Sequence, residues 1–174
     1  MDISEAIDLI RFTMTSEQSQ IWADLGCGDG VFTKALGSLL PDGSRIHAID
    51  INERALRQVP DEFGGVKIEK SVLDFTLDSV VFHQLDGIMM ANSLHYVKEQ
   101  KRFVKRMIGA LKAGGLFLLV DYDMNKANHW VPYPLPIVFA EELFLSCGAE
   151  SFNLLNKRRS VFREQWMYSA LIRN

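Results

Sequence analysis

The feature of this sequence that most constrains its fold is an alternation of short apolar stretches with segments of helical spacing. Apolar residues recur every three to four positions between most of the stretches, which predicts amphipathic helices. Strands that alternate with helices favour a parallel sheet with right-handed crossovers and helices on both faces. The sequence therefore predicts an α/β fold, a three-layer sandwich, with strands at 21–25, 45–50, 66–72, 87–91 and 116–120 and helices at 31–39, 53–59 and 99–111.

The two ends of the chain add further predicted elements. Residues 3–10 form an amphipathic pattern typical of a short helix, and 125–136 is a loop rich in proline and aromatic residues. A helix at 138–147 would end at Gly148, a residue that suits a helix C-terminus. Two final strands, 152–155 and 165–172, are close enough in sequence to pair antiparallel. They would be joined by a basic turn of Lys157, Arg158 and Arg159.

Two connections have less distinct boundaries. A short helix is expected near residues 77–83, between the strands 66–72 and 87–91. The helix at 99–111 is expected to stop at Gly114 and Gly115, because glycine is a poor helix former.

Composition narrows the class of protein. The 174 residues, of which 48% are apolar and 24% charged, suit one globular domain. The apolar runs are far shorter than the roughly 20 residues that span a bilayer, and the N-terminus lacks the pattern of a secretory signal. Two cysteines and no glycosylation sequon favour a cytoplasmic location. A net charge of -3 argues against a nucleic-acid partner.

The turn after the first predicted strand, Asp24 to Gly30, has glycines at alternate positions. Ligands of open α/β sheets bind at the carboxyl ends of strands, and glycine lets the backbone approach them closely. The dinucleotide fingerprint requires glycine or alanine where this chain has Val31 or Thr33, depending on the register. Asp50, at the end of the second strand, could bind ribose hydroxyls. The pattern predicts a nucleoside ligand without identifying the chemistry.

Several segments together resemble the class I S-adenosylmethionine-dependent methyltransferases of the small-molecule type. This resemblance runs from about Ile21 to the end and implies a single Rossmann-like domain over 1–174. It also implies seven mostly parallel strands in the order 3-2-1-4-5-7-6, the last one antiparallel. The segments that carry it are Asp24 to Gly30, His47 to Ile51, Val72 to Phe75, Gly87 to Val97 (GIMMANSLHYV) and Leu111 to Asp123 (LKAGGLFLLVDYD).

The resemblance implies S-adenosylmethionine as the cofactor and assigns its methionine end to the glycine turn. Gly26 and Gly28 would pass close to the methionine moiety, with Cys27 and Gly30 in the same turn. Asp24 would support the loop or the amino group of the ligand, and a purely loop-fixing role is the alternative. Cys27 has no neighbouring base or paired cysteine in the sequence, so a redox role is not expected.

The nucleoside end is assigned to residues that follow the next strands. Asp50 would bind the ribose diol, and Ile51 would pack on the adenine. Asp74 would accept a hydrogen bond from the adenine amino group beside the Phe75 amide. Ile51 and Phe75 could instead be core residues. The cleft would be closed by Ala91 and Asn92.

Methyl transfer is an in-line displacement at a carbon that positive sulfur activates, so positioning can supply much of the catalysis. A dedicated base is not required. Where the acceptor must lose a proton, the candidates are His95, Tyr96, Tyr122 and His129. The histidines show no metal-ligand spacing, so no metal is expected.

The expected acceptor is a small, aromatic or amphipathic molecule. Residues 92–96 read Asn-Ser-Leu-His-Tyr in place of the Asn/Asp-Pro-Pro-Tyr segment used to methylate base or glutamine amines, which disfavours those substrates. The loop 125–136 is the expected acceptor wall, with packing against the sheet edge as the alternative. Residues 1–20 are expected to supply a helix and lid region, and a homodimer could add further cover.

Two other functions stay open on the sequence alone. One is a noncatalytic methyltransferase-like module that works through a partner, although the intact glycines and acids argue against it. The other is a nicotinamide-dependent oxidoreductase, which Val31 and Thr33 disfavour.

Overall fold

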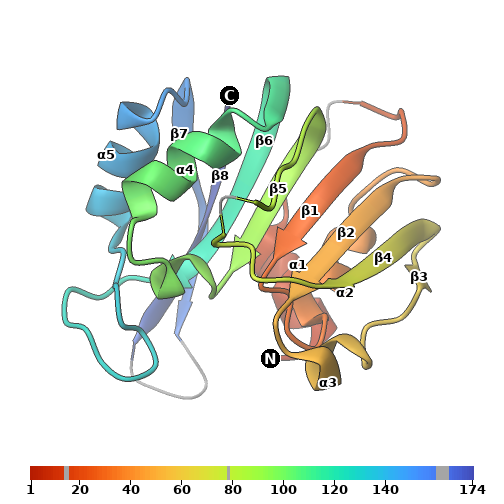
Figure 1. Cartoon of the computed structure of the whole chain (residues 1–174), viewed down its shortest axis with the longest axis horizontal. Coiled ribbons are helices and arrows are strands. Elements are labelled where there is room, and N and C mark those ends of the chain that lie inside the picture. The colour runs from red at the N-terminus through yellow and green to blue at the C-terminus, as the bar shows by residue number, and fades with distance from the viewer. Residues whose placement is uncertain (14–15, 78, 160–164) are drawn as a thin grey trace.

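The computed structural model describes residues 1–13, 16–77, 79–159 and 165–174, which form one mixed sheet with helices on both faces (Figure 1). The strands are β1 (Ile21–Leu25), β2 (Arg45–Asp50), β3 (Glu62–Phe63), β4 (Val66–Val72), β5 (Leu85–Ala91), β6 (Leu111–Tyr122), β7 (Ser151–Arg159) and β8 (Trp166–Arg173). The helices are α1 (Ile3–Ile10), α2 (Val31–Gly37), α3 (Glu53–Leu56), α4 (Gln100–Ile108) and α5 (Ile137–Ser146), with a 3-10 helix η1 (Leu94–Tyr96).

The sheet order is β3-β4-β2-β1-β5-β6-β8-β7, in which β4, β2, β1, β5 and β6 are parallel. Strand β8 runs antiparallel to both β6 and β7. The predicted α/β sandwich and its seven-strand order are thus confirmed. The predicted strand count was one too low, because Gly64 and Gly65 form a tight turn that lets β3 pair back onto β4.

Two apolar layers hold the helices against the sheet. Helices α4 and α5 cover one face, in front in Figure 1, and α1, α2 and α3 pack on the other. Gly87 of β5 is needed for this packing, because a Cβ there would lie 2.3 Å from ring carbons of the buried Trp22 on β1. Among the described helices, none has both the length and the apolar character to cross a bilayer.

The predicted end of the helix before β6 was wrong. Helix α4 stops at Ile108 with Gly109 as its C-cap, and β6 begins at Leu111. Gly114 and Gly115 lie inside β6, where the Gly114 N–H donates to Asn174 O at 2.8 Å and Gly115 O accepts from the Asn174 N–H at 2.9 Å. The two glycines therefore tie the chain terminus to the sheet and do not end a helix.

The short helix expected at 77–83 is absent from the described residues of the β4–β5 connection. An arginine of α4 binds this connection instead. The Arg106 guanidinium donates to the carbonyl oxygens of Phe75 at 2.8 Å and of Thr76 at 3.4 Å, and also to that of Leu77. The carbonyl groups of three successive residues are thus satisfied by one planar side chain.

The predicted basic turn was also wrong, because Lys157, Arg158 and Arg159 belong to β7, which pairs with β8 as far as Trp166. Arg158 forms an ion pair of 2.8 Å with Glu5 of α1, so this strand end is held by the N-terminal helix. The segment that joins β7 to β8 lies outside the described residues.

Parallel strands place their carboxyl ends at one edge of the sheet, here the lower edge in Figure 1. The residues that follow β1, β2, β4, β5 and β6 therefore gather there, which is where open α/β sheets bind ligands.

Candidate functional site

The glycine turn is tied to the neighbouring strand by its backbone. The N–H groups of Gly26 and Cys27 both donate to Ile49 O on β2, at 2.8 and 3.1 Å. Gly26, Gly28 and Gly30 all have positive φ, at 80°, 56° and 81°, a backbone region that other residues rarely adopt. The turn therefore depends on glycine at each of these positions.

The three glycines nevertheless have different surroundings. A Cβ on Gly26 would lie 2.5 Å from the Ser93 Cβ, and one on Gly30 would lie 2.9 Å from Val59. A Cβ on Gly28 would meet nothing within 4 Å. Gly26 and Gly30 thus allow close packing, whereas Gly28 presents bare backbone to open space.

Asp50 fixes the turn from the end of β2. Its Oδ2 accepts the Gly28 N–H at 2.8 Å, and its Oδ1 accepts the Asn52 N–H at 2.8 Å. Asn52 in turn caps α3. Each carboxylate oxygen can accept a second hydrogen bond, so Asp50 can hold the turn and still bind a hydroxyl group.

Asp24, at the base of the turn, is fully buried. Its Oδ2 accepts the Thr33 hydroxyl at 2.6 Å, while its Oδ1 is buried and has no hydrogen-bond partner among the described residues. Burial raises the pKa of Asp24 to about 7, against the opposing effect of the Thr33 hydrogen bond and with a further increase from the Asp50 charge. A buried carboxylate oxygen without a donor is costly in isolation and suits a cationic ligand group.

Cys27 lies beside this carboxylate and is largely buried. Burial raises the pKa of its thiol, and the negative charges of Asp24 and Asp50 raise it further. The protonated thiol, which is the less nucleophilic form, is therefore favoured.

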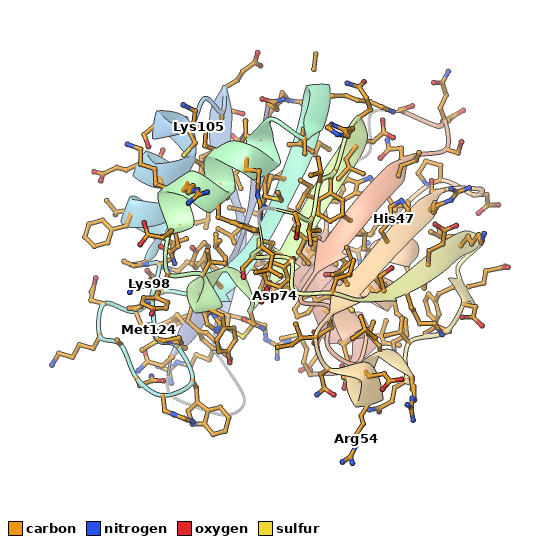
Figure 2. All side chains as sticks on the ribbon, in the orientation of Figure 1. His47, Arg54, Asp74, Lys98, Lys105 and Met124 are labelled. Carbon is orange, nitrogen blue, oxygen red and sulfur yellow. The ribbon has the colours of Figure 1, made fainter. Side chains whose placement is uncertain are left out.

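The predicted adenine residues divide into two groups. The Ile51 side chain is 69% exposed, which excludes a core position, and Asp74 is also exposed at the end of β4, near the centre of Figure 2. Asp74 Oδ1 accepts the Thr76 N–H and hydroxyl at 2.9 and 2.6 Å. The Phe75 side chain lies in the core against Phe103, with ring centroids 5.8 Å apart. Ile51 and Asp74 can thus contact a ligand, while the Phe75 ring supports the loop.

The end of β5 brings Ala91 and Asn92 to the same edge. Asn92 has a φ of 55°, and its N–H donates to Val120 O at 2.8 Å. Its Oδ1 is buried and finds no partner in the described part of the chain. The neighbouring Ser93 hydroxyl donates to Leu25 O at 2.6 Å, which fastens β5 to the glycine turn.

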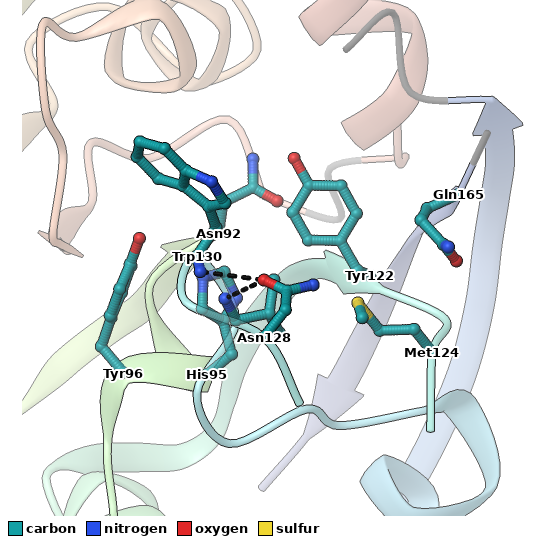
Figure 3. A pocket seen from close by; sticks show the side chains of 9 residues that line it. Asn92, His95, Tyr96, Tyr122, Met124, Asn128, Trp130 and Gln165 are labelled. Atoms are coloured by element: carbon teal, nitrogen blue, oxygen red, sulfur yellow. Dashed lines mark hydrogen bonds between the residues drawn. The ribbon is translucent and has the colours of Figure 1, made fainter. Parts of the chain in front are cut away.

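Next to Asn92 lies a pocket of about 440 Å³ (Figure 3). Asn128 orders its loop wall, because its Oδ1 accepts the N–H groups of Trp130 and Val131 at 2.8 and 3.0 Å. Asn92 links the pocket to the predicted cofactor residues. The lining side chains come from the segment after β5 with η1, the end of β6 and the loop that follows it, and the residue before β8: Asn92, His95, Tyr96, Tyr122, Met124, Asn128, Trp130, Val131 and Gln165.

The pocket brings together three of the four predicted catalytic candidates, His95, Tyr96 and Tyr122. His129 is exposed, packs on the Trp130 ring and is not one of the lining residues. Burial raises the pKa of Tyr96, and the neighbouring Tyr122 and Asp121 raise it further, so Tyr96 is a poor base.

His95 has a partner that sequence reasoning missed. Its Nδ1 lies 2.6 Å from Asp121 Oδ1, and both side chains are buried. In the sequence, Asp121 stands out only as an acid that directly follows an apolar strand. The chain order β5 then β6 places it beside His95, because the two strands are parallel neighbours.

Comparisons with known proteins agree with this geometry. Residues 23–117, more than half of the chain, match the family model described as a methyltransferase domain. The chain belongs to this methyltransferase family. The resemblance to S-adenosylmethionine-dependent methyltransferases is thereby confirmed.

The relatives are distant. An uncharacterized methyltransferase of Mycobacterium tuberculosis is 24% identical over 115 residues, which are 66% of this chain and 57% of that protein. The chain thus spans little more than half the length of that curated relative.

Solved structures share the fold. An S-adenosylmethionine-dependent methyltransferase of Methanosarcina mazei aligns with a TM-score of 0.67 at 19% identity, over 90% of this chain and 92% of that one. Phosphoethanolamine N-methyltransferase 2 of Haemonchus contortus, solved with phosphomonomethylethanolamine and S-adenosylhomocysteine, aligns with a TM-score of 0.75 at 13% identity, over 98% and 52%.

Proposed function

We propose that this chain binds S-adenosylmethionine at the glycine turn and transfers the methyl group to a small-molecule acceptor in the adjoining pocket. One observation carries the proposal. The bare backbone of Gly28, the unpartnered Asp24 oxygen and the fixed Asp50 carboxylate share one edge, and Asn92 connects them to a pocket lined by aromatic rings.

The residues at this edge suit the chemistry of that cofactor. It has an ammonium group, a ribose diol and an adenine, and it carries no phosphate. Asp24 Oδ1 would meet the ammonium group beside the backbone of Gly26, Cys27, Gly28 and Gly30. Asp50 would accept from the ribose hydroxyls with the lone pairs that Gly28 and Asn52 leave free.

The adenine would lie between Ile51 and the loop after β4. The exposed Ile51 side chain offers an apolar face, and Asp74 retains Oδ2 to accept from the adenine amino group. The Phe75 backbone is held beside it by Arg106. Ala91 and Asn92 would close the cleft from β5.

Bound S-adenosylmethionine supplies a methyl carbon made electrophilic by its positive sulfur. The protein then has to hold the acceptor for in-line attack and exclude water, which the ordered loop 125–136 and the aromatic pocket walls favour. Helix α1 packs against α2, β7 and β8, and the chain after it leads to the amino end of β1, where the Gln20 N–H donates to Ser44 Oγ. A lid from residues 1–20 would therefore have to come from the start of α1, since the N-terminus lies toward the lower edge of the sheet (Figure 1).

Three further proposals concern context. Two buried, unpaired cysteines suit the cytoplasm. The pocket volume suits a small molecule better than a nucleic acid. A homodimer could cover the open side of the site.

Calorimetric titration with S-adenosylmethionine, S-adenosylhomocysteine and NADH tests the proposal. We expect both adenosyl ligands to bind and NADH not to bind. Binding of none of the three would contradict the proposal and favour a noncatalytic module, and binding of NADH alone would favour an oxidoreductase. A screen of metabolites for transfer of a labelled methyl group would then identify the acceptor.

A further inference from the structure

Asp121 holds the His95 ring in one orientation at the wall of the pocket. The carboxylate Oδ1 lies 2.6 Å from His95 Nδ1 and also accepts the Tyr122 N–H at 2.8 Å. A carboxylate only accepts hydrogen bonds, so Nδ1 is the protonated nitrogen of the neutral ring. The lone pair of His95 is therefore on Nε2.

The remaining contacts of His95 leave Nε2 available to a ligand. His95 lines the pocket, and no residue in the described ranges hydrogen-bonds Nε2. The ring packs between Tyr96 and Tyr122, with centroids 4.5 and 6.0 Å away. The Tyr133 N–H donates to His95 O at 3.0 Å, which fixes the backbone. The imidazole is thus a preorganised base that needs no movement before it accepts a proton.

We infer that His95, held by Asp121, is the general base of the transfer and that the acceptor is an aromatic hydroxyl compound. This inference rests on the proposed function. The hydroxyl proton moves to His95 Nε2, and the oxygen electron pair forms the O–CH3 bond as the sulfonium S–CH3 bond breaks. The imidazolium that results is balanced by the Asp121 carboxylate.

The walls of the pocket define the body of the acceptor. Tyr122, Trp130, Met124 and Val131 offer flat and apolar surfaces, which favour an aromatic ring. Asn92 is one of the lining residues, and its side-chain amide can hydrogen-bond a polar substituent on that ring. An apolar ring with at least one hydroxyl group matches both features.

The same surroundings disfavour an amine acceptor. Aromatic faces and the nearby Asp121 carboxylate stabilise an ammonium cation and so oppose loss of its proton. An amine held there would keep its lone pair occupied, whereas a hydroxyl group enters neutral. The base is needed for a hydroxyl acceptor, because a neutral hydroxyl is a weak nucleophile until its proton is removed.

The ionisation of 4-nitrophenol, which absorbs differently as phenol and as phenolate, tests this inference without turnover. The probe is added to the S-adenosylhomocysteine complex at a pH below its own pKa. We expect the wild-type complex to bind the probe and to produce the phenolate band. His95→Gln should still bind it, by calorimetry, but with a phenolate band at least about tenfold weaker, the effect of one pKa unit. His83→Gln, which changes an exposed histidine outside the pocket, is the matched control and should behave as wild type.

Asp121→Asn is the second variant, because it removes the charge that balances the imidazolium and keeps the side-chain shape. It should lower the phenolate band even where His95→Gln does not fold. A probe that fails to bind the wild-type complex or stays neutral in it, or a band that survives both substitutions, would overturn the inference. Calorimetry with S-adenosylhomocysteine alone separates these outcomes from failure of the proposed function, which would abolish that binding as well.

Discussion

We expect the buried carboxyl of Asp24 to make cofactor binding sensitive to pH in a range where most carboxylates are fully ionised. Its pKa is raised to about 7 because the group is fully buried and its Oδ1 has no donor. If the ligand ammonium binds that oxygen, the carboxylate form is the one that binds. At lower pH a proton on the Asp24 carboxylate then competes with the ligand, and the affinity falls.

The size of the effect follows from the ionised fraction. With a pKa of about 7, roughly nine-tenths of Asp24 is ionised at about pH 8 and roughly one-tenth at about pH 6. The dissociation constant of S-adenosylhomocysteine should therefore rise about tenfold between these conditions, a loss of about 1.4 kcal/mol. Asp24→Asn should bind at least about tenfold more weakly than wild type at the higher pH and show little pH dependence.

The stability of the unliganded protein should change in the opposite direction with pH from its affinity for the ligand. A carboxyl whose pKa is raised on folding costs stability as the pH rises from its unfolded value of about 4 to about 7, because ionisation then occurs inside the protein. Asp24→Asn avoids that cost, so its thermal midpoint at about pH 8, without ligand, should exceed that of wild type by on the order of a few degrees.

Isothermal titration calorimetry across this pH range, with thermal unfolding beside it, is the assay. Asp29→Asn is the matched control, since it removes the same charge from an exposed position in the same turn and should preserve the pH dependence. A wild-type affinity that does not change with pH would refute the reasoning. So would an Asp24→Asn variant that keeps the wild-type dependence.

Three further predictions concern S-adenosylhomocysteine binding and stability. Gly28→Ala should stay within about 1–2 kcal/mol of wild-type stability in urea unfolding, because its methyl group enters open space, but it should bind the ligand more weakly. Gly26→Ala should mainly lose stability, because its methyl group clashes with Ser93. Asp50→Ala should weaken binding about ten- to a hundredfold in calorimetry, the effect of losing a charge-assisted hydrogen bond of about 1.5–3 kcal/mol; unchanged affinity would remove Asp50 from the site. Arg106→Ala should weaken binding several-fold, because it releases the carbonyl groups of residues 75–77. Arg106→Lys should recover little of the lost affinity, because lysine lacks the planar guanidinium fork. Lys105→Ala, which changes an exposed residue of the same helix (Figure 2), should leave the affinity unchanged.

The sequence was a good guide wherever the structure is decided by local pattern. β1 is a mostly apolar run and β4 alternates apolar with polar residues, so β1, β2 and β4 could be placed at their correct ends, and the glycine turn followed from its spacing. The boundaries that failed depend on distant partners. Lys157 to Arg159 extend β7 through pairing with β8 and with Glu5, more than 150 residues away in the chain.

The candidate site shows the same division. Asp24, Asp50 and the glycines are close in sequence to strand ends and could be recognised there. The pairing of His95 with Asp121 joins residues 26 positions apart, one in η1 after β5 and the other near the end of β6, and no local pattern predicts it. The burial that raises the Asp24 pKa depends on the packing around its side chain, which is bonded to Thr33 of α2, and composition cannot reveal it.

The attachment of residues 75–77 to Arg106 bears on the order in which the parts of the proposed binding site form. All the carboxylates assigned to the cofactor lie within the first 74 residues, yet the loop beyond Asp74 is fastened by a side chain some 30 positions later. During synthesis, the early strands can form their ladder before α4 has docked on the sheet. We therefore expect the adenine end of the proposed cleft to reach its final shape only after α4 has docked on the sheet.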